Sequence, residues 1–408
     1  MNRRRTMMLG GGLIALIAAL WLGQRALGSA GAGQASGEAP IFAVDPLWPK
    51  PLPNHWLVGT SIGLWVDDQD NVWMVHRGAP DLDPNERGLE LGTAECCATA
   101  PHVLAFDPEG NLIQAWGGPG QGYDWPESLH GIFVDDMGYV WLGASGPGDS
   151  HFLKFTQDGT FVQQYGRPNA RLGQPDSEGQ PTFTPDSNDP ENFGRVAELA
   201  VDPAANEVYV ADGYFNKRVA VVDATTGAIK RYWGAYGNRP DDAYVFSAPG
   251  SGDPQNPPQQ FRGSVHCIGL SNEGLLYVCD RQSNRVQVFT REGEFVREAF
   301  FAPNTLSSGS AWDVAFSRDA EQRYLFLADA TNSKVRVILR ETMQEVTNFG
   351  DGGRQPGQFF GVHNVALDSQ GNLYTTETFE GTRIQKFVNM GTGSVAPEQG
   401  TVWPTAAR

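Results

Sequence analysis

The stretch HGIFVDDMGYVWLG at residues 130–143 returns in altered form as HNVALDSQGNLYTTE at residues 363–377. Both alternate apolar and polar residues on either side of a short polar turn, which is typical of a β-hairpin. Related segments begin at Ile62, Ala197, His266 and Trp312, and later strands such as RVAVVD at residues 218–223 follow each hairpin. About four strands per unit, repeated every 40–70 residues or so, are typical of propeller blades. The sequence therefore predicts an all-β, six-bladed β-propeller.

The ends of the ring and its long loops can also be predicted. The sixth repeat is one strand short, so we expect an N-terminal strand near His55–Val58 to complete the last blade and leave no long exposed edge. The propeller then spans residues 55–390, preceded by a linker at 33–54 and followed by a tail at 391–408. Inserts rich in Pro, Gly, Asp and Asn are expected to form loops at residues 79–101, 167–193 and 238–262.

The first 32 residues have the pattern of a targeting segment. Three arginines, Arg3 to Arg5, precede an apolar run from Met7 to Leu22, and small residues follow around Ser29 and Ala32. This order predicts a signal peptide and an exported, periplasmic or secreted protein. An uncleaved segment would instead serve as a membrane anchor, and we expect no other membrane contact.

Composition and charge exclude several classes of protein. The chain has 49 Gly, 27 Pro and only 19 % charged residues, which argues against helical bundles and coiled coils. It carries 30 Lys and Arg against 47 Asp and Glu, a formal charge of −17. A strongly acidic protein is a poor binder of nucleic acid or of anionic lipid. Four cysteines are too few for a disulfide scaffold.

The histidines follow the repeat in a regular way. When the six copies are aligned on their turns, one position holds Ile62, His130, Ala197, His266, Trp312 and His363. Histidine thus occupies blades 2, 4 and 6, about 120° apart around a channel that the first strand of each blade lines. Three neutral imidazoles with an open position are the usual ligands of catalytic zinc. The alternative is three unrelated channel histidines bonded to water or backbone.

Two further side chains are expected at the mouth of this channel. Arg77 ends the second strand of blade 1, and Tyr214 lies in the corresponding loop of blade 3, which is one residue longer than the loops that follow Asp280 and Asp329. Second strands return to the face where the histidines begin, so both residues should meet them there. The repeated Asp, Asn and Arg or Lys of these loops are expected to be structural.

These residues carry a resemblance to a known family. The repeats resemble those of NHL-type six-bladed propellers. More narrowly, HRG at residues 76–78, HGIFVDD from 130, VADGYFNKR around Tyr214, His266 before CIGL, and VHNVALD around His363 resemble the peptidyl-α-hydroxyglycine α-amidating lyases. The resemblance implies that His130, His266 and His363 bind zinc and that Arg77 and Tyr214 are catalytic.

The resemblance also implies a structural calcium in the channel. The carbonyl oxygens that bind it in the family correspond to Leu64 and Ile132, and its aspartate corresponds to Asn364, whose amide oxygen can still bind Ca²⁺. The cysteine that the family pairs beside the tyrosine is replaced by Phe215. The pairing of Cys96, Cys97, Cys267 and Cys279 stays open: the first two are adjacent, and the last two lie on neighbouring strands.

The function that the resemblance implies is cleavage of α-hydroxyglycine-type carbinolamides to a primary amide and glyoxylate. The substrate is then a small-molecule or peptide α-hydroxy amide, zinc lowers the pKa of its hydroxyl, and Tyr214 is the general base or proton shuttle. Arg77 suits either the substrate carboxylate or the stabilisation of Tyr214 as its phenolate. The alternative is a non-catalytic propeller that binds a protein or ligand in the extracytoplasmic space. The oligomeric state cannot be predicted from these residues.

Overall fold

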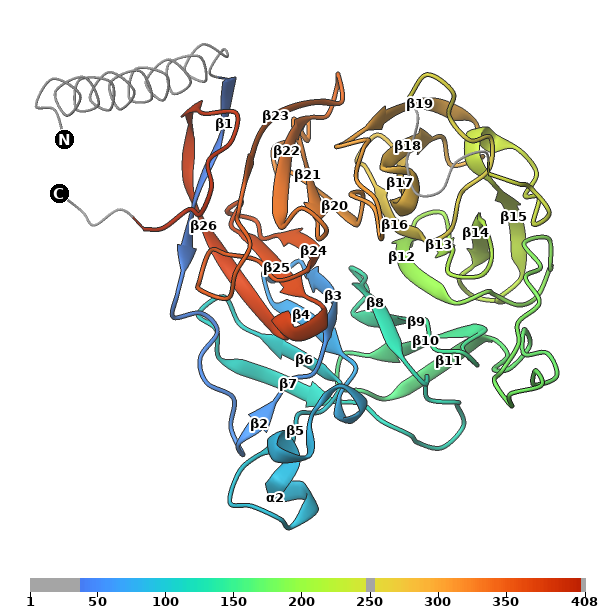
Figure 1. Cartoon of the computed structure of the whole chain (residues 1–408), viewed down its shortest axis with the longest axis horizontal. Coiled ribbons are helices and arrows are strands. Elements are labelled where there is room, and N and C mark those ends of the chain that lie inside the picture. The colour runs from blue at the N-terminus through green and yellow to red at the C-terminus, as the bar shows by residue number, and fades with distance from the viewer. Residues whose placement is uncertain (1–36, 247–253, 405–408) are drawn as a thin grey trace, which may run out of the picture.

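The computed structural model describes residues 37–246 and 254–404. Within them, the strands form six four-stranded antiparallel sheets and one two-stranded sheet. The six sheets stand around a central channel as the blades of a propeller (Figure 1). The prediction of a six-bladed all-β propeller is therefore confirmed. The predicted signal peptide or anchor at residues 1–32 lies outside the described residues.

The blades follow one another along the chain. Blade 1 contains β3 (Ser61–Val66), β4 (Val72–His76), β6 (Val103–Phe106) and β7 (Leu112–Trp116). Blade 2 contains β8 (Leu129–Val134), β9 (Tyr139–Ala144), β10 (His151–Thr156) and β11 (Phe161–Gly166). Blade 3 contains β12 (Val196–Asp202), β13 (Glu207–Asp212), β14 (Arg218–Asp223) and β15 (Ile229–Trp233). In each, the first strand is innermost and contacts the first strand of the next blade.

The second half repeats this plan. Blade 4 contains β16 (Val265–Leu270), β17 (Leu276–Asp280), β18 (Arg285–Phe289) and β19 (Phe295–Phe300). Blade 5 contains β20 (Asp313–Phe316), β21 (Tyr324–Asp329), β22 (Lys334–Leu339) and β23 (Gln344–Phe349). Blade 6 contains β24 (Val362–Leu367), β25 (Leu373–Glu377), β26 (Arg383–Val395) and, as its outer strand, β1 (Gly37–Asp45).

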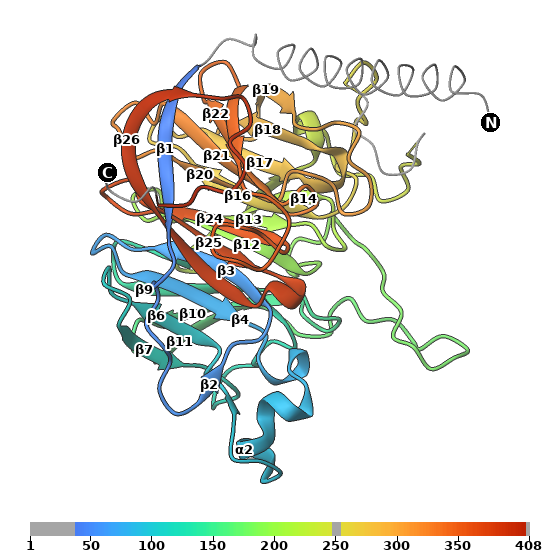
Figure 2. The same cartoon turned by 60° about the vertical axis from the view of Figure 1, so that its left-hand side comes forward.

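The ring closes between its two ends, but not where the sequence suggested. β1 pairs antiparallel with β26, from Gly37 opposite Val395 to Asp45 opposite Lys386 (Figure 2). The prediction that a strand near His55–Val58 closes the ring is wrong. In that segment, β2 (Trp56–Leu57) pairs in parallel with β5 (Ala98–Thr99) of the first insert. β1 lies in the segment 33–54 that we expected to be a linker, and it buries Phe42 and Val44.

The side chain of Phe42 packs β1 against blade 5. Its ring is 4 % exposed and lies 5.4 Å from that of Phe349 and 5.7 Å from that of Phe326. We expect Phe42→Ala to lower the free energy of unfolding by about 3–5 kcal/mol, because it leaves a cavity between blades 5 and 6. Leu47→Ala is the control, since Leu47 is 84 % exposed. Urea unfolding followed by fluorescence measures both, and equal stability of the two variants would contradict closure by β1.

The aspartate at the polar turn of the hairpin has a structural role in the repeats that carry it. Asp135 accepts hydrogen bonds from the backbone N–H groups of Met137 and Tyr139 and from the indole of Trp141 at 2.8 Å. In blade 1, Asp67 accepts from backbone N–H groups and from the indole of Trp73. In blade 6, Asp368 accepts from backbone N–H groups and from the hydroxyl of Tyr374. The carboxylate therefore fixes the hairpin turn and its core aromatic together, which explains why this pattern marks the repeats.

A second repeated device holds the loops after the second strands. Buried or part-buried ion pairs join an acid at the end of that strand to an arginine at or near the start of the third strand. They are Asp212–Arg218, Asp280–Arg285, Asp329–Arg336 and Glu377–Arg383 in blades 3 to 6, at 2.6–2.9 Å. The expectation that these repeated residues are structural agrees with these pairs.

Short helices lie in the connections: η2 (Ala79–Asp81), η3 (Pro84–Arg87) and α2 (Gly88–Leu91) in the first insert, and η4 (Ala235–Gly237), η5 (Arg281–Ser283) and η6 (Phe379–Gly381) elsewhere. In the part of the chain that the structure describes, none of the helices has the length and apolar character needed to cross a bilayer.

Candidate metal centre

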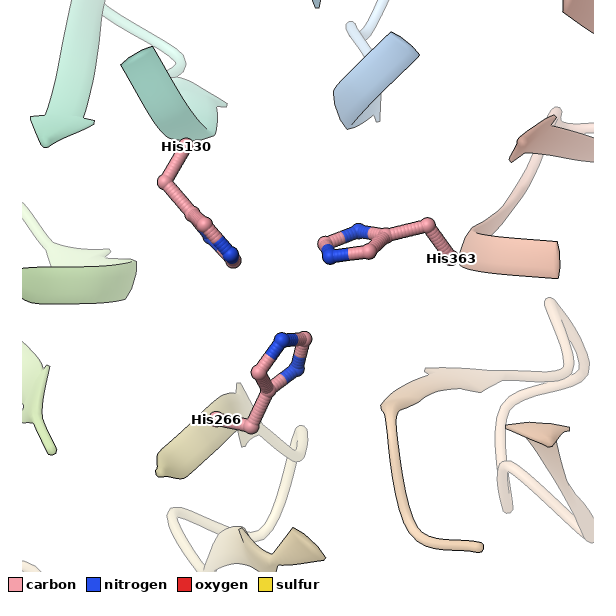
Figure 3. Close-up of side chains that lie close together, drawn as sticks. All are labelled: His130, His266 and His363. Carbon is pink, nitrogen blue, oxygen red and sulfur yellow. The ribbon is translucent and has the colours of Figure 1, made fainter. Parts of the chain in front are cut away.

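The three aligned histidines converge on the axis of the propeller. His130, His266 and His363 are each the second residue of the innermost strand of their blade. The pairing register of all three strands shifts at this position, as at a β-bulge, and a bulge re-aims the side chain that it carries. Figure 3 shows the three rings pointing toward a common centre. Their ring centroids are 4.9–5.0 Å apart, and one nitrogen of each lies within 4.8 Å of the others.

The outer nitrogen of each ring is already engaged. Nδ1 of His130 lies 2.7 Å from the carbonyl oxygen of Ala197, and Nδ1 of His266 lies 2.6 Å from that of Trp312. Nδ1 of His363 lies 2.7 Å from Oδ1 of Asn364. Since these partners only accept hydrogen bonds, Nδ1 must carry the proton in all three rings. The lone pairs of the three Nε2 atoms are left for the shared centre, as is usual for metal-binding histidines.

Burial keeps these imidazoles neutral. The rings are 1–2 % exposed. Desolvation lowers the pKa of His363 to about 3 and moves the pKa of His130 and His266 well below the usual range, with the positive charges of Arg77 and Arg281 contributing. Three neutral imidazoles with lone pairs turned inward fit a divalent transition metal, so the structure shows a three-histidine cluster that can hold a metal ion.

Tyr214 lies directly against this cluster, as predicted. Its hydroxyl oxygen is 2.7 Å from Nε2 of His130 and 3.1 Å from Nε2 of His266. Nη1 of Arg281 donates to the same oxygen at 3.4 Å. A phenol that touches two candidate ligands and a guanidinium is placed to exchange a proton with a group bound at the cluster.

Arg281 is a site residue that the sequence interpretation missed. It directly follows β17, just as Arg77 directly follows β4, so the two arginines occupy the same position in blades 1 and 4. These blades face each other across a six-bladed ring. The shared position was a signal that could have found Arg281, but the repeated Asp, Asn and Arg or Lys of these loops led us to expect a structural role for the whole loop.

Two arginines near the cluster have no acidic partner. Among the described residues, neither Arg77 nor Arg281 makes an ion pair, and the Nε atoms of both are buried without a hydrogen-bond partner. Arg281 is 8 % exposed, and its guanidinium lies 4.4 Å from the Trp312 ring. Buried donors left without partners are costly, so these two cations suit an anionic ligand.

His76 is buried behind Arg77 rather than exposed. Its Nδ1 accepts hydrogen bonds from the backbone N–H groups of Gly59 and Gly78, both at 3.1 Å, and its Nε2 donates to the carbonyl oxygen of Pro101 at 2.9 Å. These bonds fix the backbone on the C-terminal side of Arg77. His76 therefore holds the backbone next to Arg77.

This arrangement predicts a loss of stability in acid. Burial lowers the pKa of His76 to about 4, whereas an imidazole in the unfolded chain titrates near 6.5. The unfolded state takes up the proton first. The contribution of His76 to the free energy of unfolding is therefore complete above pH 6.5 and falls by on the order of 3 kcal/mol as the pH approaches 4. His76→Asn keeps an acceptor near the Nδ1 position without titrating, and its unfolding free energy should fall less between pH 7 and 4.5. Equal pH dependence of the two proteins in urea unfolding would contradict this role.

Two buried carboxyls on first strands connect neighbouring blades, blade 3 to blade 4 and blade 5 to blade 6. Glu198 accepts a hydrogen bond from the backbone N–H of Ile268, and Asp313 accepts one from that of Val365. Burial raises the pKa of both, that of Asp313 to about 6, and the charge of Asp313 raises that of Glu198 further. A carboxylate oxygen of Glu198, one of Asp313 and the sulfur of Cys267 lie within 4.8 Å of one another. The sulfur of Cys267, however, is bonded to that of Cys279 in a disulfide.

The residues of the predicted calcium site lie on first strands of three neighbouring blades. Leu64 is in β3, Ile132 in β8 and Asn364 in β24. Oδ1 of Asn364 already faces Nδ1 of His363 and accepts from the Thr376 hydroxyl at 3.0 Å. Calcium at Leu64, Ile132 and Asn364 stays a prediction.

The cysteines form two disulfides in the structure. Cys96 is bonded to Cys97 in the first insert, and Cys267 is bonded to Cys279 across β16 and β17. The second bond joins the strand that carries His266 to its neighbour.

The fold and the cluster together define a class: an NHL-type six-bladed propeller with a three-histidine cluster on its axis. Comparisons with known proteins agree with the resemblance. The chain is 25 % identical over 319 residues to NHL repeat-containing protein 3 of Mus musculus, covering 74 % of this chain and 71 % of the relative. It is 24 % identical over 369 residues to peptidyl-alpha-hydroxyglycine alpha-amidating lyase 1 of Drosophila melanogaster, covering 85 % and 60 %.

A third relative is longer. The chain is 27 % identical over 251 residues to peptidyl-glycine alpha-amidating monooxygenase B of Xenopus laevis, covering 59 % of this chain but only 24 % of that protein. No family model matches the chain. The chain thus resembles NHL-repeat proteins and amidating enzymes, and it spans a minor part of the longer amidating protein.

Proposed function

We propose that the protein is a zinc-dependent lyase that cleaves α-hydroxyglycine-type carbinolamides, R–CO–NH–CH(OH)–COO⁻, to a primary amide and glyoxylate. The observation that carries the proposal is the meeting of three inward Nε2 lone pairs with the Tyr214 hydroxyl and two unpaired arginines. The similarity to the Drosophila lyase supports it. The substrate would be a small-molecule or peptide α-hydroxy amide that the protein meets outside the cytoplasm, in the periplasm or after secretion.

The donor set suits zinc because the three ligands are neutral imidazoles whose orientation is held by hydrogen bonds to Nδ1. When bound to His130, His266 and His363, zinc would supply Lewis acidity that lowers the pKa of the substrate hydroxyl.

The protein's own residues would bind the substrate and move its proton. Arg77 and Arg281, which lack carboxylate partners, would hold the substrate carboxylate on either side of the cluster. Tyr214, after losing its own phenolic proton, would take the substrate hydroxyl proton at its phenolate oxygen and pass it to the departing amide nitrogen. The carbon–nitrogen bond breaks as the hydroxyl carbon becomes the aldehyde of glyoxylate, so the reaction needs no oxidant or reductant.

Metal analysis followed by an assay tests this function. We expect about one equivalent of zinc in the purified protein. We also expect glyoxylate release from α-hydroxyhippurate that a chelator stops and zinc restores. Zinc without turnover of any carbinolamide would contradict the lyase and favour a binding module.

A further inference from the structure

A third arginine lies beside the cluster, on the side of the second insert. Arg195 comes immediately before β12, and its carbonyl oxygen accepts a hydrogen bond from the backbone N–H of Tyr214 at 3.4 Å. Its guanidinium carbon is 5.4 Å from the centre of the Tyr214 ring and 4.4 Å from that of the Phe215 ring. The two arginines already described follow second strands, whereas Arg195 approaches Tyr214 from the start of a first strand.

An aromatic wall supports this guanidinium. Phe215 stacks on Phe183 of the insert at residues 167–193, with ring centroids 4.0 Å apart and planes 22° apart. Nε of Arg195 donates to the carbonyl oxygen of Ser145, which fixes the direction of the group. A guanidinium that rests on an aromatic face still presents the edge of its fork to a carboxylate.

Arg195 has no anionic partner in the protein. Within residues 37–246 and 254–404, it makes no ion pair and its two Nη groups have no hydrogen-bond partner. The nearby acids are otherwise engaged: Asp149 accepts from the backbone N–H groups of Gly146, Glu127 and Ser128, and Glu127 accepts from that of Gly148. Burial lowers the pKa of Arg195, which indicates that the charge is partly removed from water.

Three unpaired cations exceed what one carboxylate requires. Elsewhere in the chain, buried arginines such as Arg218 and Arg285 are matched to an acid. Arg77 and Arg281 flank the histidine cluster and suffice for the carboxylate of the glycine part. Arg195 instead rests on the aromatic wall, 4.4 Å from the centre of the Phe215 ring, where it can meet a group that extends from the cluster past Tyr214.

We infer that Arg195 determines substrate specificity by binding a second carboxylate, carried on the acyl part of the substrate. The preferred substrates are then N-acyl-α-hydroxyglycines whose acyl group is itself acidic. This inference rests on the proposed lyase function, because it assigns the parts of that substrate to the three arginines.

A pair of substrates that differ only in this charge tests the inference. N-glutaryl-α-hydroxyglycine and N-pentanoyl-α-hydroxyglycine differ by a carboxylate in place of a terminal methyl group. We expect kcat/KM of the zinc-loaded protein to favour the glutaryl compound by about 10- to 100-fold, as for a charge-assisted hydrogen bond. In Arg195→Gln this ratio should fall to about one, and Arg195→Lys should retain part of it.

Arg167→Gln is the matched control. Arg167 lies in the insert at residues 167–193, as Phe183 does, but its side chain is 71 % exposed and paired with Glu191. Its substrate ratio should equal that of the wild-type protein. A wild-type ratio near one, or a preference that survives in Arg195→Gln, would overturn the inference.

Binding of unreactive analogues separates this inference from the lyase proposal. N-glutarylglycine and N-pentanoylglycine lack the hydroxyl and cannot be cleaved. Calorimetry should show tighter binding of the glutaryl compound to the wild-type protein and equal binding of the two to Arg195→Gln. If neither hydroxyglycine is cleaved but this binding difference appears, the reaction is wrong and the anion subsite stands. Equal binding to the wild-type protein overturns the subsite.

Discussion

The His266→Ala variant should bind the metal at least about 100-fold more weakly than the wild-type protein, because one of three ligands is lost from a preformed site. We expect purified His266→Ala to contain less than about a tenth of an equivalent of zinc after dialysis and to release no measurable glyoxylate. Elemental analysis and the glyoxylate assay measure the two effects in the same preparation.

His151→Ala is the matched control for this variant. His151 is also buried, at 1 % exposed, but its Nε2 donates to the carbonyl oxygen of Asp124 away from the cluster. Its removal should cost stability and leave the zinc content unchanged. Full zinc content in His266→Ala would show that the three histidines do not hold the metal, and the proposed function would then fail.

Tyr214→Phe should lower kcat by about 10²- to 10⁴-fold, the usual contribution of a positioned proton-transfer group. The variant loses only the hydroxyl that contacts His130, His266 and Arg281, so the ring can keep its place beside Arg195. Because the three Nε2 atoms are untouched, the zinc content should stay at the wild-type level. This combination of full metal content and low kcat distinguishes proton transfer from a merely structural role.

Tyr232→Phe provides the comparison for that experiment. Tyr232 lies in β15 of the same blade, and its hydroxyl donates to the carbonyl oxygen of Asn188 at 3.3 Å. This substitution should leave kcat within about twofold of the wild-type value, as is usual for a site remote from the chemistry. A wild-type kcat in Tyr214→Phe would assign the proton transfer to another group.

The arginines near the histidines lack the acidic partners that several blade-loop arginines have. Blades 3 to 6 each pair an acid with an arginine around the loop after the second strand; the acid is Asp in blades 3 to 5 and Glu in blade 6. Arg77, Arg195 and Arg281 are unpaired among the described residues and gather near the histidines. The chain has a formal charge of −17, so acids are available. The lack of an acidic partner at these three arginines therefore favours the binding of an anionic ligand.

Where the sequence interpretation went wrong, the reason is long-range packing. The segment near Trp56 has the apolar residues of a strand, as does the segment around Phe42 and Val44. Only the contact of Phe42 with Phe326 and Phe349 decides which of them completes blade 6. Similarly, the burial of His76 depends on contacts with Gly59 and Pro101, which a local pattern does not reveal.

By itself, the sequence determined the six blades and the convergence of His130, His266 and His363, because hairpin alternation is local and a closed ring brings every second blade's equivalent position to one axis. The tertiary structure alone decided the closing strand, the inward direction of each Nε2, and the approach of Arg195 and Arg281 to Tyr214. These features depend on bulges and on side-chain contacts between blades, and such contacts join residues too far apart in the chain for a local pattern to reveal them.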